Sequence, residues 1–242
     1  MEFADASPPV EVAPAEYLRL LGYPRNYVLA ERSLELAGAS REWYARHGRP
    51  WLYARETESL EIANGTVTID GVPFASRRLE TTLQRAEAHA VFLVAAGAGP
   101  EAEEQADRLW REEKPDEYFF LEVFGSAVVE HLITAAGARL CAWADERGMA
   151  VLPHSSPGYA QWNIAQQAAL LRLIQSGGHA LPRKLEALDS GALLPKKSQL
   201  GVFGLTRHAA LVERLTDLVP CRSCSFAPCQ FRRVPYVRAC NQ

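Results

Sequence analysis

Hydrophobic residues recur at helical spacing along several long segments of the chain. This spacing predicts helices over residues 14–21, 26–47, 78–88, 100–114, 116–147 and 161–175, with a last short helix over 207–218. Gly22, Gly148 and Gly177 follow three of these segments, as expected for residues that end a helix. Acidic residues begin the 100–114 segment, where the helix dipole favours negative charge.

Strand-like patterns lie between the predicted helices. Residues 51–74 alternate apolar and polar positions and contain the turn pairs Asn64-Gly65 and Asp70-Gly71, which predicts antiparallel strands joined by tight turns. Residues 89–97 form a continuous apolar run of strand length, which is typical of a buried central strand. Further strands are expected at 150–154 and within 194–206.

The order of these segments predicts a single domain of mixed strands and helices, without internal repeats or a linker. We expect residues 1–14, which are rich in proline and alanine, to form a flexible arm. The domain is expected over 15–220, followed by a cysteine-rich tail over 221–242.

Composition narrows the class of protein. The chain is 48% hydrophobic and 23% charged, with a net charge of −3, so it has the composition of a globular protein without a basic field for nucleic acid. The apolar run at 90–99 is too short to cross a membrane, and the first residues lack the pattern of a secretory signal. We therefore expect a cytoplasmic protein that binds neither nucleic acid nor membrane.

Residues 153–167, PHSSPGYAQWNIAQQ, carry the chain's most distinctive chemistry. Pro157-Gly158 predicts a sharp turn, because proline fixes φ and glycine tolerates positive φ. Such a turn can present backbone groups to a ligand, and Tyr159 adds a flat amphipathic face. A plain connection between a strand and a helix, with a serine cap, accounts for the same residues.

Five segments, taken in order, resemble the activation domain of vitamin B12-dependent methionine synthase, especially its short free-standing relatives. They are YLRLLGY (17–23), HAVFLVAAG with the acidic helix start after it (89–104), FFLEVFGSAVVEHL (119–132), SSPGYAQWNIAQQ (155–167) and LLPKKSQLGVFG (193–204). The resemblance spans about 17–233. It implies an α+β fold, with a curved, mainly antiparallel sheet and flanking helices.

The resemblance also implies a function. Domains of that family bind S-adenosylmethionine in a shallow groove and present its methyl group to a corrinoid, cob(II)alamin, held by a partner domain. The implied binding stretch covers His154, Ser155, Ser156, Pro157, Gly158 and Tyr159. Glu130 matches the helix glutamate that would face the positively charged ligand. A solvated glutamate at this position is the alternative.

The sequence departs from the family pattern at two places. His154 stands where relatives usually have arginine, so the bidentate contact to a ligand carboxylate would be lost and binding would be weaker or dependent on pH. A histidine that merely ends a strand is the alternative. Residues 188–190, Leu-Asp-Ser, replace the family's Thr-Glu-Ser.

The tail has metal-ligand spacing. A Cys-x-x-Cys pair followed by two further cysteines could hold zinc or an iron–sulfur cluster, through Cys221, Cys224, Cys229 and Cys240. Reduced thiols without a metal are the alternative. Cys141 lies in an apolar helical pattern and is expected in the core.

These observations favour an S-adenosylmethionine-binding accessory module that takes part in reductive remethylation of a corrinoid methyltransferase. Its partners would be a separate corrinoid-binding protein and a reductant protein, and any enzyme activity would be that of a component of methionine synthase. Two alternatives are a non-catalytic binding protein of the same fold and an electron carrier acting through the cysteine tail.

Overall fold

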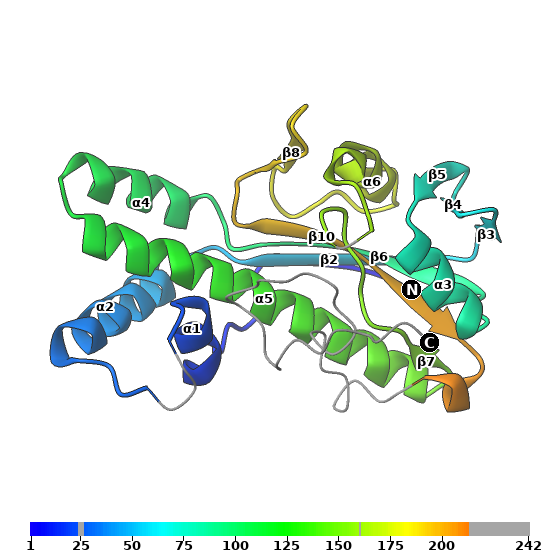
Figure 1. Cartoon of the computed structure of the whole chain (residues 1–242), viewed down its shortest axis with the longest axis horizontal. Coiled ribbons are helices and arrows are strands. Elements are labelled where there is room, and N and C mark those ends of the chain that lie inside the picture. Colours follow the sequence, from blue (N-terminus) through cyan, green and yellow to red (C-terminus); the bar gives the residue numbers. More distant parts are fainter. Residues whose placement is uncertain (24–26, 160, 213–242) are drawn as a thin grey trace, which may run out of the picture.

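A five-stranded antiparallel sheet forms the centre of the molecule (Figure 1). The computed structural model describes residues 1–23, 27–159 and 161–212. The strand order is β1-β2-β6-β10-β7, with β1 at Glu2–Asp5, β2 at Trp51–Thr57, β6 at Ala90–Gly97, β10 at Ser198–Thr206 and β7 at Ala150–Val151. All neighbouring pairs run antiparallel. The expected α+β class with a mainly antiparallel sheet is confirmed.

Strand β6 is the central strand, as its continuous apolar run predicts. All eight of its residues are buried. Because side chains alternate across a strand, Phe92 and Val94 point into one apolar cluster and Leu93 and Ala95 into another. The sheet therefore has a core on each of its two faces.

Helices cover both faces of the sheet. On one face lie α5 (Pro115–Asp145), α1 (Pro14–Leu20), α2 (Glu31–His47) and α4 (Glu101–Arg111), and on the other lie α3 (Arg77–Arg85) and α6 (Gln167–Gln175). Figure 1 shows α5 below the sheet and α6 above it. Two predicted helix starts are wrong. Helix α2 begins at Glu31 rather than at 26, and α6 begins at Gln167 after a 3-10 turn, Ile164–Gln166.

Helix α5 is long and apolar enough, by length and composition alone, to cross a membrane. Its apolar side chains are used differently here. Phe120, Phe124, Leu132 and Leu140 are buried in the cluster between the sheet and helices α1 and α2. The helix is therefore the main core element of this face.

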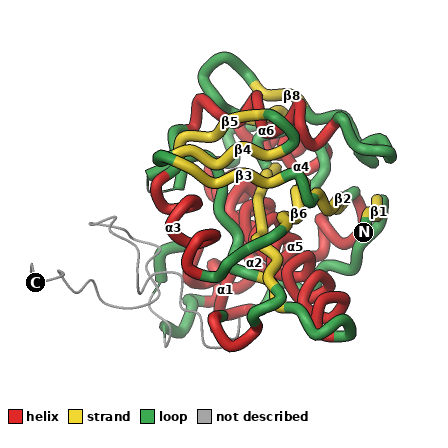
Figure 2. The backbone as a smooth tube through the Cα atoms, turned by 90° about the vertical axis from the view of Figure 1, so that its right-hand side faces the viewer, coloured by secondary structure: helices red, strands yellow, loops and turns green. Residues whose placement is uncertain are grey.

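A three-stranded sheet, β3 (Leu60–Ala63), β4 (Thr66–Ile69) and β5 (Val72–Ala75), packs on the second face (Figure 2). Both of its turns follow the sequence prediction. Asn64-Gly65 and Asp70-Gly71 have positive φ at both residues, as two-residue hairpin turns require. The remaining short elements are the strand pair β8 (Glu186–Ala187) and β9 (Leu193–Leu194), and a 3-10 turn, Ala209–Leu211.

The expectation of a flexible arm over residues 1–14 is wrong for its first part. Strand β1 pairs with β2 along its whole length. Tyr53 donates a hydrogen bond of 2.6 Å to Glu2, and the N-terminal ammonium lies 2.6 Å from Glu56. Polar side chains on an edge strand hide the alternation that identifies a strand in sequence. The predicted tail over 221–242 lies outside the described residues.

Candidate functional site

The turn after β7 is attached to β10 through its serines. The backbone N–H and C=O of Ser155 both pair with Val202, at 2.9 and 2.8 Å. The hydroxyl of Ser156 donates to the carbonyl of Leu200. Both serines are buried. Strand pairing therefore uses the N–H of Ser155 and one lone pair of its carbonyl oxygen, and a ligand contact of its backbone stays a prediction.

The sharp turn itself is confirmed. Gly158 has φ of 93°, which only glycine adopts readily. Its N–H donates to the carbonyl of Trp162, and the N–H of Tyr159 donates to the carbonyl of Ser156. Trp162 is buried against Phe74, with ring centroids 5.8 Å apart. The tryptophan thus anchors the turn to the small sheet instead of starting α6.

A chain of side-chain hydrogen bonds joins this turn to β10. The amide of Gln199 donates to the phenol oxygen of Tyr159 at 2.9 Å, and Nε2 of His154 lies 2.9 Å from the same oxygen. The phenol oxygen accepts from Gln199, and the phenol hydrogen can donate to Nε2 of a neutral His154 that carries its proton on Nδ1.

The surroundings of His154 also favour its neutral form. Burial, together with the nearby positive charge of Arg78, lowers the pKa of His154 from 6.5 to about 4. The histidine is therefore uncharged at neutral pH. The expected dependence of binding on the charge of His154 would fall near pH 4, well below the physiological range.

Helix α5 lies along the odd-numbered residues of β10. Ser126 accepts a hydrogen bond of 2.9 Å from Lys197, and Gly137 lies against the ring of Phe203. Glu130 is one helical turn after Ser126 on the stripe that leads to Gly137. Glu130 therefore lies on the side of α5 that runs along β10, and the imidazole of His154 packs over Gly201 of that strand.

A side chain at Gly201 would be in van der Waals contact with His154 and Phe203. A Cβ at Gly201 would meet no atom closer than 3.8 Å. Glu130 is half-buried, and its carboxylate makes no hydrogen bond or ion pair that the described part of the chain shows. Tyr159 keeps 36% of its surface exposed. The structure thus brings His154 and Tyr159 together beside β10, and Glu130 lies on the helix that packs along the same strand.

A second polar cluster lies at the start of β10. Glu122 on α5 is 3.0 Å from both Lys196 and Lys197. Lys197 is 14% exposed, and its stem lies against Gly125. Glu122 therefore partly neutralises the lysine pair and joins the helix to the strand.

Two of these contacts could not be read from the sequence motifs. Gln199 and Glu122 belong to segments that resemble the family, but neither residue stood out as a site residue. The cysteines proposed as metal ligands, Cys221, Cys224, Cys229 and Cys240, lie outside the described residues. Within residues 1–23, 27–159 and 161–212, no group of three or more potential ligands gathers around a metal position.

Comparison with known proteins gives one clear likeness. No protein-family model matches the sequence, and a search of curated proteins finds no similar sequence. Among solved structures, the crystal structure of the MetH reactivation domain bound to AdoHcy aligns with a TM-score of 0.56. The alignment covers 77% of this chain and 69% of that chain, at 12% identity. This chain has the fold of the MetH reactivation domain.

The likeness to the MetH reactivation domain confirms the resemblance seen in the sequence, at the level of the fold. It includes the curled antiparallel sheet with its flanking helices. At 12% identity the match does not carry over the roles of individual residues. The ligand-binding roles of Glu130 and of residues 154–159 therefore stay predictions.

Proposed function

We propose that this protein binds S-adenosylmethionine beside β10 and serves as an accessory module for a cytoplasmic corrinoid methyltransferase. The observation that carries the proposal is the contact of His154 with Tyr159 beside β10, in the fold of a domain crystallised with AdoHcy, with the half-buried Glu130 on the helix that packs along this strand. A carboxylate suits this position because S-adenosylmethionine carries an ammonium and a sulfonium.

The residues fit this ligand in part. Tyr159 offers a partly exposed aromatic face, and the half-buried Glu130 offers a counter-charge. His154 cannot replace an arginine at the ligand carboxylate, because it is neutral and bonded to Tyr159. We therefore expect weak binding, with the adenosyl and sulfonium groups recognised better than the carboxylate.

In this role the protein positions the methyl donor and performs no covalent chemistry itself. The partner's corrinoid would supply a cobalt that, after reduction by one electron from a reductant protein, could accept the methyl group, and S-adenosylhomocysteine would remain in this protein. The residues of this chain would hold the sulfonium, keep water from it and orient it toward the docked partner.

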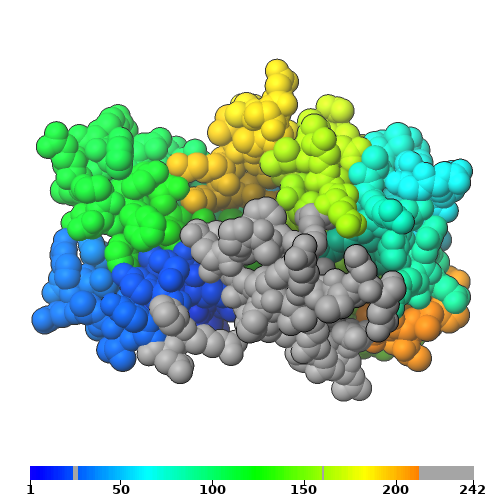
Figure 3. Space-filling model, viewed as in Figure 1, coloured from blue at the N-terminus to red at the C-terminus, as the bar shows by residue number. Residues whose placement is uncertain are grey.

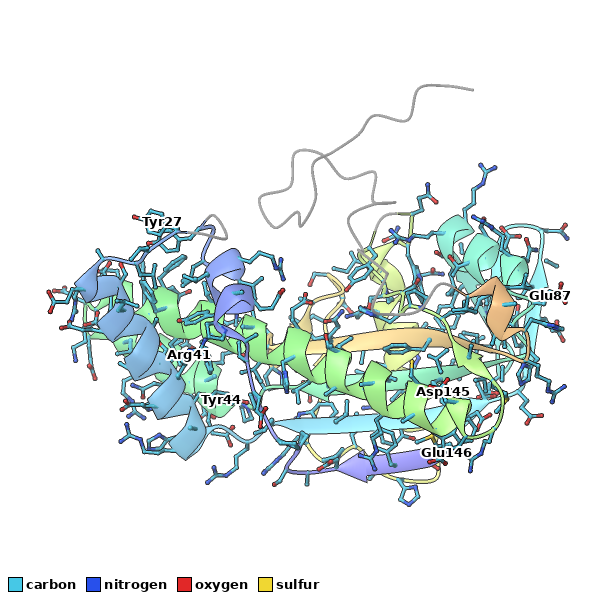
Figure 4. The ribbon with its side chains drawn as sticks, turned by 90° about the horizontal axis from the view of Figure 1, so that it is seen from below. Tyr27, Arg41, Tyr44, Glu87, Asp145 and Glu146 are labelled. Atoms are coloured by element: carbon cyan, nitrogen blue, oxygen red, sulfur yellow. The ribbon has the colours of Figure 1, made fainter. Side chains whose placement is uncertain are left out.

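Calorimetric titration of the full chain with S-adenosylmethionine tests the proposal. We expect a dissociation constant in the micromolar to millimolar range, unchanged between pH 6 and pH 8 because His154 is neutral at both. Glu130→Gln should weaken binding at least fivefold. Glu146→Gln, at the far end of α5 (Figure 4), is the matched control and should bind like the wild type.

A non-catalytic binding protein of the same fold is the second candidate. The hydrogen-bond chain from Gln199 through Tyr159 to His154 favours it, since these polar groups satisfy one another. Absence of heat with millimolar S-adenosylmethionine at either pH would support this candidate. Capture of a corrinoid protein from the same cells, followed by a remethylation assay, would support the first.

A further inference from the structure

A cavity of about 720 Å³ opens between residues 8–14, helix α2 and helix α5. Its walls are mainly apolar and include Pro14, Tyr44 and Phe124. The cavity lies against a different part of α5 from Glu130. Nothing in the proposed S-adenosylmethionine site uses its residues.

Arg41 is the positively charged group in the wall of this cavity. Figure 4 shows Arg41 beside Tyr44 where α2 meets α5. Its guanidinium carbon lies 5.3 Å from the ring centroid of Tyr17 and 5.5 Å from that of Phe124. One terminal nitrogen donates to the carbonyl of Val12 at 2.9 Å. These contacts hold the guanidinium in one place.

Among the residues that the structure describes, Arg41 has no acidic partner. Its hydrogen bond to Val12 is the sole one that it makes within the described part of the chain, and no carboxylate there lies within ion-pair distance. Burial lowers its pKa, although an arginine remains charged. A partly buried cation without a counter-charge is costly. An anion in the cavity would remove that cost and could accept hydrogen bonds from the guanidinium N–H groups that do not bind Val12.

The walls restrict the charge of that anion. Glu11 also lines the cavity, at its exposed edge, and would repel a second negative charge. The remaining lining is apolar or aromatic, apart from the glycine backbone. A dianionic phosphate is therefore disfavoured, whereas a single carboxylate with an apolar body matches both the cation and the walls.

We propose that this cavity binds a small monocarboxylate, with its carboxylate on Arg41 and its apolar body against Pro14 and Phe124. The site is separate from β10 and does not depend on S-adenosylmethionine binding. It gives the protein a second ligand, of a different chemical class from the methyl donor.

Benzoate and benzamide are suitable probes, because they have the same shape and differ in charge. Binding to the full chain is followed by ¹H–¹⁵N NMR, through the side-chain Nε–H of Arg41 and the backbone N–H of Tyr44. We expect benzoate to shift both signals in a saturable way and to bind at least tenfold more tightly than benzamide and inorganic phosphate.

Two variants and a control complete the test. Arg41→Met keeps an apolar stem over the aromatic rings and should abolish the preference for benzoate. Ala45→Trp obstructs the cavity from an exposed position of α2 and should weaken both probes. Arg46→Met, on the same helix and paired with Glu42, should bind like the wild type.

Several results would overturn the proposal. They are equal binding of benzoate and benzamide by the wild type, tighter binding of phosphate than of benzoate, and no saturable shift with either aromatic probe. If Arg41→Met does not fold, the comparison of the two probes on the wild type and on Ala45→Trp still decides.

Discussion

The phenol oxygen of Tyr159 lies 2.9 Å from Nε2 of His154, five residues earlier in the chain. This bond closes the turn around Gly158, and the 2.9 Å bond from Gln199 fixes the same oxygen to β10. The position of the tyrosine ring is therefore set by His154 and Gln199. Protonation of His154 would turn its Nε2 from an acceptor into a donor, so the phenol oxygen would have to accept both hydrogen bonds.

The stability of the protein should depend on this histidine. The pKa of His154 is about 4 in the folded protein and near 6.5 when unfolded, so the unfolded chain binds a proton first as the pH falls. The histidine's contribution is full above pH 6.5 and is lost as the pH falls toward 4. Between pH 7 and pH 4.5, we expect the free energy of unfolding to fall by about 2 kcal/mol less in His154→Gln than in the wild type.

Urea unfolding at the two pH values measures this difference. The matched control is His47→Gln, since His47 is exposed on α2. Equal pH dependence of the wild type and His154→Gln would contradict the assignment.

Two glycines of β10 should respond differently to a methyl group. A Cβ at Gly204 would lie 2.3 Å from Leu152 and 2.6 Å from Leu83, whereas one at Gly201 would meet nothing closer than 3.8 Å. Gly204→Ala should therefore cost about 1–3 kcal/mol of unfolding free energy through overpacking. Gly201→Ala should fold with unchanged stability, as thermal unfolding of the two variants will show. Similar melting temperatures would contradict this packing.

Lys197 should matter more for stability than its neighbour. It is 14% exposed and contacts both Glu122 and Ser126, while Lys196 is 38% exposed. Lys197→Met removes a partner of Glu122 and of Ser126, which are both partly buried. It should therefore lower the free energy of unfolding by about 1–3 kcal/mol. Lys196→Met is the control, with an expected cost below about 1 kcal/mol. Chemical unfolding of both variants tests the order, and a larger loss for Lys196→Met would reverse it.

Glu2 should stabilise the first strand at neutral pH. Burial alone would raise its pKa, but hydrogen bonds from Tyr53 and His179 lower it to about 2. Its contribution is therefore full above pH 4.5 and is lost as the pH falls toward 2. Glu2→Gln should lower the free energy of unfolding by about 1–2 kcal/mol at pH 7.

The difference between the wild type and Glu2→Gln should narrow between pH 4.5 and pH 2. Glu61→Gln, on an exposed position of β3, serves as the control and should show no loss at pH 7. A cost for Glu2→Gln that stays constant down to pH 2 would argue against the lowered pKa.

The parts of the fold that could be predicted from the sequence are those set by local pattern. The eight apolar residues of β6 and the Asn64-Gly65 turn behave as their sequences predict. Strand β1 was missed because Glu2 and Asp5 bring charge to an edge, where pairing depends on the partner strand. The start of α6 was misplaced because Trp162 is anchored on Phe74 from a distant segment.

The candidate site also combines a feature that local sequence predicts with contacts that depend on distant residues. The turn at Pro157-Gly158 follows from two residues, and the structure has it. The hydrogen bond between Gln199 and Tyr159 joins residues 40 positions apart and depends on the register of β10 against Ser155. No local pattern encodes that register. Figure 3 shows the segment that leads into β10, in gold, next to the segment before α6, an adjacency that only folding creates.

The strand order has a consequence for synthesis of the protein. Strand β6 gains β2 on one side early, but its other neighbour, β10, begins only at Ser198. While the intervening residues leave the ribosome, one whole edge of the most apolar strand has no neighbour. A nascent chain in this state offers an open edge to other chains, so its protection falls to chaperones or to rapid elongation.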